Sequence, residues 1–167
     1  MDCCVALTLA AKATTHLKLG TGVTNPVTRH PATAAAAIAS VQTLSDGRAH
    51  LGIGRGDSSL AYIGYAPAPL KVLEAYLIKL QAYLRGDSVP FDLDSNVDSL
   101  RLADTPGGSR LTWLPPEQTK VPVDMAATGP RALAMASRHA DRISLMVGAD
   151  PERVSWAMGV ARKAREE

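Results

Sequence analysis

Aromatic residues, cysteines and an excess of one charge are all scarce in this sequence, and each shortage excludes a class of protein. Only 4% of the residues are aromatic whereas 46% are hydrophobic, so we expect a core built from Ala, Val, Leu and Ile. The two cysteines, Cys3 and Cys4, are adjacent, which excludes the disulfide framework of small secreted domains. The formal net charge is +2 and the Lys and Arg residues are scattered, so we expect no nucleic-acid partner.

Long hydrophobic runs and grouped histidines are missing as well. No apolar stretch reaches the length of a membrane span, and the first residues lack the basic start of a secretion signal. We therefore expect a cytoplasmic protein without a membrane partner. The four histidines do not stand at metal-ligand spacing with carboxylates, so we expect no metal. The length of 167 residues is enough for one domain with a substantial core.

Hydrophobic periodicity predicts a first helix that is followed by strand–helix units. Asp2 is placed to cap the first helix, whose apolar positions Val5, Leu9 and Ala13 share one face. The later helices begin near prolines, a residue that the first helical turn tolerates well, at Pro31, Pro69, Pro130 and Pro151. The expected buried faces of these helices include Leu44 and Met158.

Between the helices, short apolar runs predict four strands, at 17–24, 49–55, 121–127 and 142–147. Residues 87–120 break this rhythm, and we expect an irregular insertion there with a short hairpin near 111–114. Strands that alternate with helices predict an α/β protein with a parallel sheet, either open and doubly wound or a (β/α)₈ barrel. We expect the four strands to be neighbours in chain order, because connections between parallel strands are short and right-handed.

Residues 49–58, Ala-His-Leu-Gly-Ile-Gly-Arg-Gly-Asp-Ser, combine a strand with a glycine-rich end. Glycine at alternate positions leaves little side-chain bulk on one face, so another group can approach the backbone closely. Arg55 and Asp57 follow the strand directly, at the edge where α/β proteins keep their catalytic groups. The same pattern also serves as a packing device, so by itself it leaves both interpretations open.

Five motifs in order resemble the luciferase-like flavin and deazaflavin oxidoreductases. They are Leu-Gly-Thr-Gly-Val-Thr-Asn-Pro at 19–26, Thr-Arg-His-Pro at 28–31, Ser-Asp-Gly-Arg at 45–48, Leu-Gly-Ile-Gly-Arg-Gly-Asp-Ser at 51–58 and Ala-Ala-Thr-Gly-Pro-Arg-Ala at 126–132. The branch they resemble most is that of the methylenetetrahydromethanopterin reductase-like proteins. These use an 8-hydroxy-5-deazaflavin, coenzyme F420, in place of FMN. The resemblance is weakest over 87–120.

The resemblance implies a (β/α)₈ TIM barrel, a fold that needs about 250 residues. The chain holds only four strand–helix units, so residues 1–167 are expected to form a single fragment of a luciferase-like barrel, with 87–120 as an insertion loop. By analogy the strands are the third to sixth of the barrel. The first and last strands of the fragment would have exposed edges. It would then be either a truncated product or a half-barrel that pairs with another copy as a homo-oligomer.

The resemblance also implies a coenzyme site at the carboxyl ends of the strands. A non-proline cis peptide between Gly22 and Val23 would support the ring, Asn25 would hydrogen-bond it, and Asp57 would act as the catalytic acid. Arg55, with Gly56 beside it, would bind a phosphate or carboxylate of the coenzyme tail. The strand-to-helix junction would hold that phosphate-bearing tail with free backbone N–H groups and one arginine, over Ala127, Thr128, Gly129, Arg131 and Ala132.

Each of these residues also has a purely structural interpretation. Asn25 before a proline suits a turn, Asp57 could cap a short helix or pair with Arg55, and Thr128 could cap the following helix. If the functional interpretation holds, Asn25, Asp57 and Gly129 should converge on one cleft. The leading hypothesis is then an oxidoreductase that transfers a hydride between coenzyme F420, or FMN, and a small organic substrate. The alternatives are a non-catalytic half-barrel that binds a partner subunit or is inactive, and a phosphate-binding barrel enzyme unrelated to flavins.

Overall fold

The computed structural model describes residues 1–91 and 107–166, so residues 92–106 of the expected insertion lie outside the described part. Its centre is a parallel sheet of four strands, in the order β1 (Leu19–Gly20), β2 (Ala49–Ile53), β5 (Val123–Ala127) and β6 (Arg142–Leu145). Every neighbouring pair is parallel, and the spatial order is the chain order. The predicted sheet is confirmed.

The first strand is much shorter than predicted. Only Leu19 and Gly20 pair with β2 in regular register, and the chain rejoins the sheet at Thr24, which bridges to Ile53. Between these points the backbone bulges away from the sheet, and the Thr21 hydroxyl donates a 2.6 Å hydrogen bond to the Gly52 carbonyl. The apolar alternation of 17–24 continues through this bulge, which is why the sequence predicts a longer strand.

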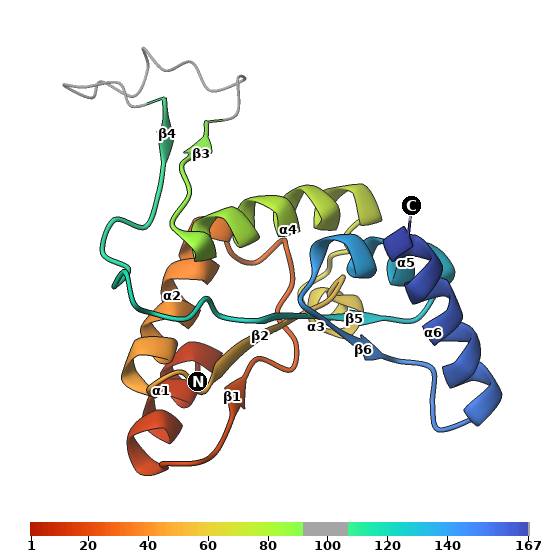
Figure 1. The fold of residues 1–167 in the computed structure, drawn as a ribbon, viewed down its shortest axis with the longest axis horizontal. Helices are drawn as coiled ribbons and strands as arrows, with labels where there is room; N and C mark the ends of the chain where they lie inside the picture. The colour runs from red at the N-terminus through yellow and green to blue at the C-terminus, as the bar shows by residue number, and fades with distance from the viewer. Residues whose placement is uncertain (92–106, 167) are drawn as a thin grey trace.

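Five helices cover one face of the sheet: α1 (Cys3–Ala13), α2 (Pro31–Leu44), α4 (Leu70–Arg85), α5 (Pro130–His139) and α6 (Pro151–Glu166). They form a single layer in chain order, because each packs on the next from α1 to α6 (Figure 1). Their ends follow the expected signals. The Asp2 carboxylate accepts a 2.9 Å hydrogen bond from the Cys4 N–H, and Gly86 ends α4 in the left-handed conformation.

The core lies between the sheet and this helix layer. Alternate strand residues such as Leu51, Ile53, Val123 and Met125 are fully buried against the helices. The residues between them therefore point to the other face of the sheet, which no helix covers in the described part of the chain. By register, that inner face carries Gly52, Asp124, Arg142, Ala126 and Ser144. One covered face and one open face fit part of a (β/α)₈ barrel, in which the open face would line the interior.

The predicted buried faces of the outermost helices are partly wrong. Val5 and Leu9 are 53% and 58% exposed, and α1 instead buries Ala11 with help from Leu7 and Ala10. Met158 in α6 is also exposed, as is Leu44 at the end of α2. Val5 and Leu9 border an open surface hollow between α1 and α2, next to Ala37 and Ser40, and therefore meet solvent beside the neighbouring helix. Leu44, in the last turn of α2, is exposed for its own local reason, next to the turn that leaves the helix.

The insertion contains a hairpin, but not at the predicted place. Strands β3 (Val89–Pro90) and β4 (Gly108–Ser109) pair antiparallel and project from the body of the fold (Figure 1). This pairing needs glycine at position 108, because a Cβ atom there would lie only 2.5 Å from the Val89 carbonyl oxygen. The predicted hairpin at 111–114 is wrong, since those residues form turns and unpaired chain.

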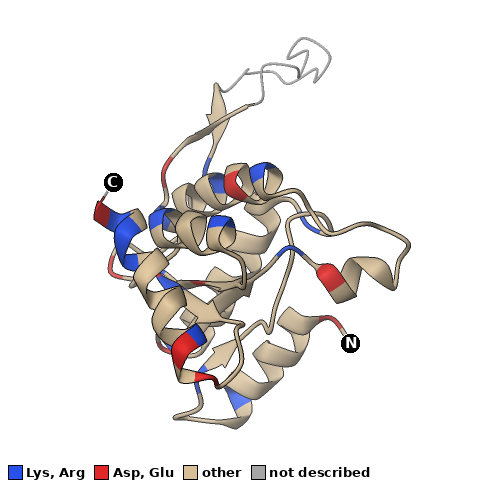
Figure 2. Cartoon of the chain, turned by 90° about the vertical axis from the view of Figure 1, so that its right-hand side faces the viewer, with Lys and Arg blue, Asp and Glu red and all other residues tan. Residues whose placement is uncertain are grey.

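Charged residues of both signs are interspersed along the described helices and loops in the view of Figure 2. In the same part of the chain, no helix is both long and apolar enough to cross a membrane.

Candidate functional site

A hollow of about 560 Å³ lies at the carboxyl ends of the strands. Four segments that are far apart in sequence form its walls: the bulge after β1, the turn between β2 and α3 (Asp57–Ala61), the turn between β5 and α5, and the residue after β6. Most of the lining is backbone or small side chains. Its residues are Gly22, Val23, Gly54, Arg55, Gly56, Asp57, Ser58, Ser59, Ala126, Ala127, Thr128, Gly129, Ala132 and Met146.

Glycine is needed at positions 52 and 54 because the protein's own bulge lies on top of them. A Cβ at Gly52 would lie 2.1 Å from the Thr21 carbonyl oxygen, and one at Gly54 would lie 3.1 Å from a methyl of Val23. The group that approaches the backbone of Gly52 and Gly54 closely is therefore the protein's own segment, residues 21–23. The Gly22–Val23 peptide bond is cis, as the resemblance implies, and both residues line the hollow.

Asp57 is the first residue of α3, and its side chain is exposed at the hollow. The N-cap of α3 is Gly56, with φ at 85°, so the interpretation of Asp57 as a cap is wrong. Glycine is required at 56 because a Cβ there would meet Leu60 and Asn25 at 2.9 Å or less. The carboxylate of Asp57 makes no hydrogen bond or ion pair with any described residue. It is therefore free to meet a ligand.

Arg55 has a structural partner rather than an acidic one. Its Nε donates a 2.8 Å hydrogen bond to the Ala68 carbonyl, and the Ala68 N–H donates to the Arg55 carbonyl at 3.0 Å. The alternative of an ion pair with Asp57 does not occur, although both side chains are described. These bonds hold the segment before α4 against the wall of the hollow, and the guanidinium borders the hollow.

Asn25 lies behind the wall rather than in it. The residue is only 4% exposed, and its side-chain oxygen accepts 3.0 Å hydrogen bonds from the N–H groups of Val27 and Thr28. Its amide nitrogen lies 3.3 Å from the Ser59 hydroxyl, which lines the hollow. Asp57 and Gly129 thus share the hollow as expected, whereas Asn25 braces it from outside. A direct contact of Asn25 with a coenzyme stays a prediction.

The junction between β5 and α5 offers backbone donors. Gly129 is the N-cap of α5 and makes no side-chain capping bond, so the interpretation of Thr128 as the cap is wrong. Pro130 has no N–H, which leaves those of Arg131 and Ala132 at the helix start, where the dipole favours an anion. Ala132 lines the hollow together with Thr128 and Gly129, whereas the Arg131 side chain is exposed outside the lining set.

Sequence reasoning missed several lining residues, among them Ser58, Ser59 and Met146. Met146 follows β6, and its N–H donates a 2.9 Å hydrogen bond to the Ala127 carbonyl, which continues the ladder by one residue. Alternation along this strand places its side chain on the inner side, a signal that was available once the strand was assigned. The floor of glycine and alanine with a rim of carboxylate and hydroxyl groups can accept a planar ring, so the residues present fit a flavin-type coenzyme.

Comparison with known proteins agrees with this geometry. The whole chain, residues 1–167, matches the family model for luciferase-like monooxygenases. The chain is 33% identical over 139 residues to a 5,10-methylenetetrahydromethanopterin reductase of Methanolobus tindarius, covering 82% of this chain and 39% of the relative. It is 32% identical to an F420-dependent hydroxymycolic acid dehydrogenase of Mycobacterium tuberculosis, covering 82% of this chain and 37% of that protein.

A solved structure gives the same picture. The coenzyme F420-dependent tetrahydromethanopterin reductase from Methanopyrus kandleri superposes with a TM-score of 0.79 at 25% identity, covering 99% of this chain and 50% of that one. The chain therefore spans less than half the length of the two curated relatives and half the length of this structural relative.

Proposed function

Because the chain belongs to the luciferase-like monooxygenase family, we propose that it supplies half of the active site of an oxidoreductase. The reaction would be hydride transfer between coenzyme F420 and a small organic substrate, with FMN as the alternative coenzyme. The observation that carries this proposal is the hollow at the carboxyl ends of the strands, which brings the bulge, Asp57 and the start of α5 together. The names of two relatives include F420, and this favours the deazaflavin over FMN.

The residues of the hollow have distinct roles in this proposal. The Gly22–Val23 bulge, Gly54 and Ala126 present a surface with little side-chain bulk, against which a tricyclic ring can stack. The N–H groups at the start of α5 and the side chains of Arg131 and Arg55 bind the anionic tail. When bound, the coenzyme supplies the hydride chemistry, and the protein supplies orientation and electrostatics.

Asp57 is the residue we assign to proton transfer. Among the described residues it is the only carboxylate that lines the hollow, and none of them occupies its oxygens. A carboxylate can hold or release a proton at a substrate oxygen that lies within hydrogen-bond reach. Ser58, Ser59 and Thr128 add hydroxyl groups on the same rim, which can orient a polar substrate.

The half-barrel leaves one side of the ring unprotected. In the part of the chain that the structure describes, helices cover only one face of the sheet, and Ala126 and Met146 line the hollow from the other face. A ring stacked on these strands alone would bury one of its two faces, and it would give up apolar contact at about 25 cal/mol per Å² on the other. We therefore expect the isolated chain to bind the coenzyme weakly as a monomer.

A second candidate function is a non-catalytic half-barrel that docks on a partner subunit. Exposed apolar residues on the first and last helices favour it, namely Val5 and Leu9 on α1 and Trp156 and Met158 on α6. A second copy is a poor fit for this partner. In a (β/α)₈ barrel one helix covers each groove between strands, and pairing β6 with β1 of another copy would bring α6 and α1 to the same groove. A partner half-barrel that has four strands, but fewer helices than this chain, would leave the outer grooves free for α1 and α6.

A binding experiment tests the coenzyme proposal. The purified chain, shown to be monomeric by light scattering, is titrated with F420 and separately with FMN, and fluorescence is recorded. We expect saturable binding with a Kd of about 0.1–1 mM, tighter for F420. Gly54→Leu, which fills the hollow above Val23 and Ala126, should weaken binding at least tenfold. Gly159→Ala in α6, where a Cβ meets no atom within 4 Å, is the matched control and should bind like the wild type.

The outcomes separate the two candidates. Equal affinity of Gly54→Leu and the wild type would show that the hollow is not the coenzyme site. The absence of saturable binding to either coenzyme would contradict the first candidate and leave the docking function.

A further inference from the structure

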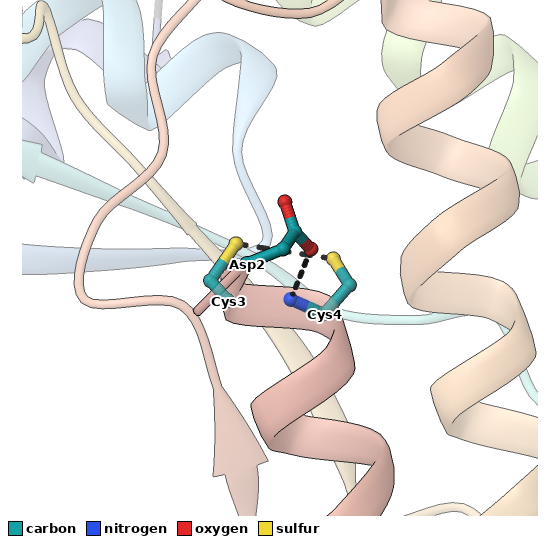
Figure 3. A group of neighbouring side chains, drawn as sticks. All are labelled: Asp2, Cys3 and Cys4. Carbon is teal, nitrogen blue, oxygen red and sulfur yellow. Dashed lines mark hydrogen bonds between the residues drawn. The ribbon is translucent and has the colours of Figure 1, made fainter.

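The start of α1 brings together three potential metal ligands outside the candidate active site. The Asp2 carboxylate and the thiols of Cys3 and Cys4 each offer one ligand atom, and these atoms all lie within 4.8 Å of one another (Figure 3). We propose that these three residues bind a divalent metal ion that prefers thiolate ligands, with Zn²⁺ as the biological candidate. The expectation of no metal considered only the spacing of the histidines, and it stays untested.

The separation of the two sulfur atoms suits a shared metal ion. Cys3 Sγ and Cys4 Sγ are 3.9 Å apart. Two thiolates on a tetrahedral Zn²⁺ with Zn–S bonds near 2.3 Å are about 3.8 Å apart. Binding therefore needs little movement of the sulfur atoms. Cys3 is exposed and Cys4 is half-buried, so an ion can reach both from solvent.

Asp2 is held in place by contacts that leave it able to coordinate. Its Oδ1 accepts hydrogen bonds from the N–H groups of Cys4 at 2.9 Å and Val5 at 3.4 Å, and its Oδ2 contacts the Arg29 guanidinium. A carboxylate has about four acceptor positions, so one stays available for a metal ion. Three protein ligands and one water would complete a tetrahedral site.

The local charge favours the loaded state. Two thiolates, one carboxylate and a divalent ion carry a net charge of −1. The N-terminus of α1 and the Arg29 guanidinium both place positive charge next to this complex. The positive charge of Arg29 and of the helix start therefore offsets the net negative charge of the loaded site.

Loading the site displaces protons. Thiols ligate a metal ion as thiolates, so each cysteine gives up its proton on binding. The reaction is the exchange of one divalent ion for two thiol protons, with no change of oxidation state. The sulfur atoms must be reduced beforehand.

Cobalt substitution tests this site. The full chain, with both thiols shown to be free by a thiol assay, is titrated with Co²⁺ and then with Zn²⁺. We expect a thiolate-to-cobalt charge-transfer band that saturates at one ion per chain and is abolished by Zn²⁺. Cys3→Ser and Cys4→Ser should each weaken binding at least 100-fold. Asp2→Asn, which keeps the N-cap, should weaken it about tenfold.

The controls keep the proposal falsifiable. His16→Ala, which removes an exposed histidine beyond the end of α1, should leave the cobalt titration unchanged. The unfolding transition of each variant shows whether the fold is intact. Absence of the charge-transfer band, unchanged binding in the double Cys→Ser variant, or saturation at one ion per two chains would each overturn the proposal.

Discussion

The two ends of the parallel sheet are built from different kinds of residue. At the amino end, polar side chains reach across several elements and make several hydrogen bonds each, as Arg48, Gln42 and Asp141 show. At the carboxyl end, the hollow is lined by glycine, alanine and short polar side chains, and Asp57 has no partner in the described structure. The amino end therefore stabilises the fold, whereas the carboxyl end is left free for a ligand, the division typical of barrels.

Arg48 is the strongest single connection at the amino end. Its guanidinium donates to the carbonyls of Ala11 at 3.0 Å, Thr14 at 2.9 Å, Leu17 at 2.8 Å and Ser45 at 2.7 Å. These carbonyls belong to the ends of α1 and α2 and to the segment before β1, where helix carbonyls lack partners of their own. One side chain thus ties two helices to the sheet, which explains why the Ser-Asp-Gly-Arg motif is structural.

The largest effect in this comparison should come from Arg48. Arg48→Ala leaves four backbone carbonyls without a partner and should lower the free energy of unfolding by about 2–4 kcal/mol. Urea denaturation followed by circular dichroism measures the loss. Arg48→Lys should recover only part of it, because an ammonium group cannot span the same carbonyls. Arg153→Ala, on exposed surface of α6, is the control, and a loss no larger than in this control would contradict the prediction.

Asp141 connects three elements at the same end. Its Oδ2 accepts from Lys120 Nζ at 2.7 Å, from the Val123 N–H at 2.8 Å and from Gln81 Nε2 at 3.2 Å. Partial burial by itself would raise the pKa of Asp141, but the hydrogen bonds from Lys120 and Val123 outweigh it. The pKa is therefore lowered from its ordinary value of 3.8.

An intermediate effect with a defined pH dependence is expected for Asp141→Asn. A carboxyl pKa that is lower in the folded state adds stability above pH 3.8, and this stability is lost as the pH falls through the folded pKa. The substitution should cost about 1 kcal/mol at pH 7, and the difference from the wild type should shrink below pH 3.8. Denaturation at a series of pH values measures it. Asp87→Asn, whose ion pair with Arg85 is half exposed, should show neither effect, and a pH-independent difference for Asp141→Asn would refute the assignment.

The smallest effect is expected at the carboxyl end. Asp57→Ala removes a side chain that makes no hydrogen bond to a described residue, and it should change the free energy of unfolding by less than about 0.5 kcal/mol. The same urea denaturation measures it. If Asp57→Ala lowered the free energy of unfolding as much as Asp141→Asn does, Asp57 would be structural. The proposed difference between the two ends of the sheet would then not hold. Ser58→Ala, on the same rim, provides the comparison for a neighbouring exposed residue.

Much of the architecture could be predicted because it depends on local signals. Alternation within 49–53 and 123–127, the cap at Asp2 and the glycine at 86 each act within a few residues, and all appear in the structure as expected. The order of the strands also follows from short connections. The family motifs added the bulge at Gly22 and Val23, which no periodicity indicates.

What the sequence by itself determined is therefore the set of elements, their order in the sheet and the residues that follow each strand. Only the tertiary structure decided which polar side chains are free. Asn25 is a candidate ligand in sequence, but its side-chain oxygen finds backbone partners across a turn. Arg48 and Gln42 find backbone partners in segments far away along the chain. Asp57 finds none among the described residues. The reason is physical, since a hydrogen bond needs a partner within about 3 Å and sequence separation does not specify that distance.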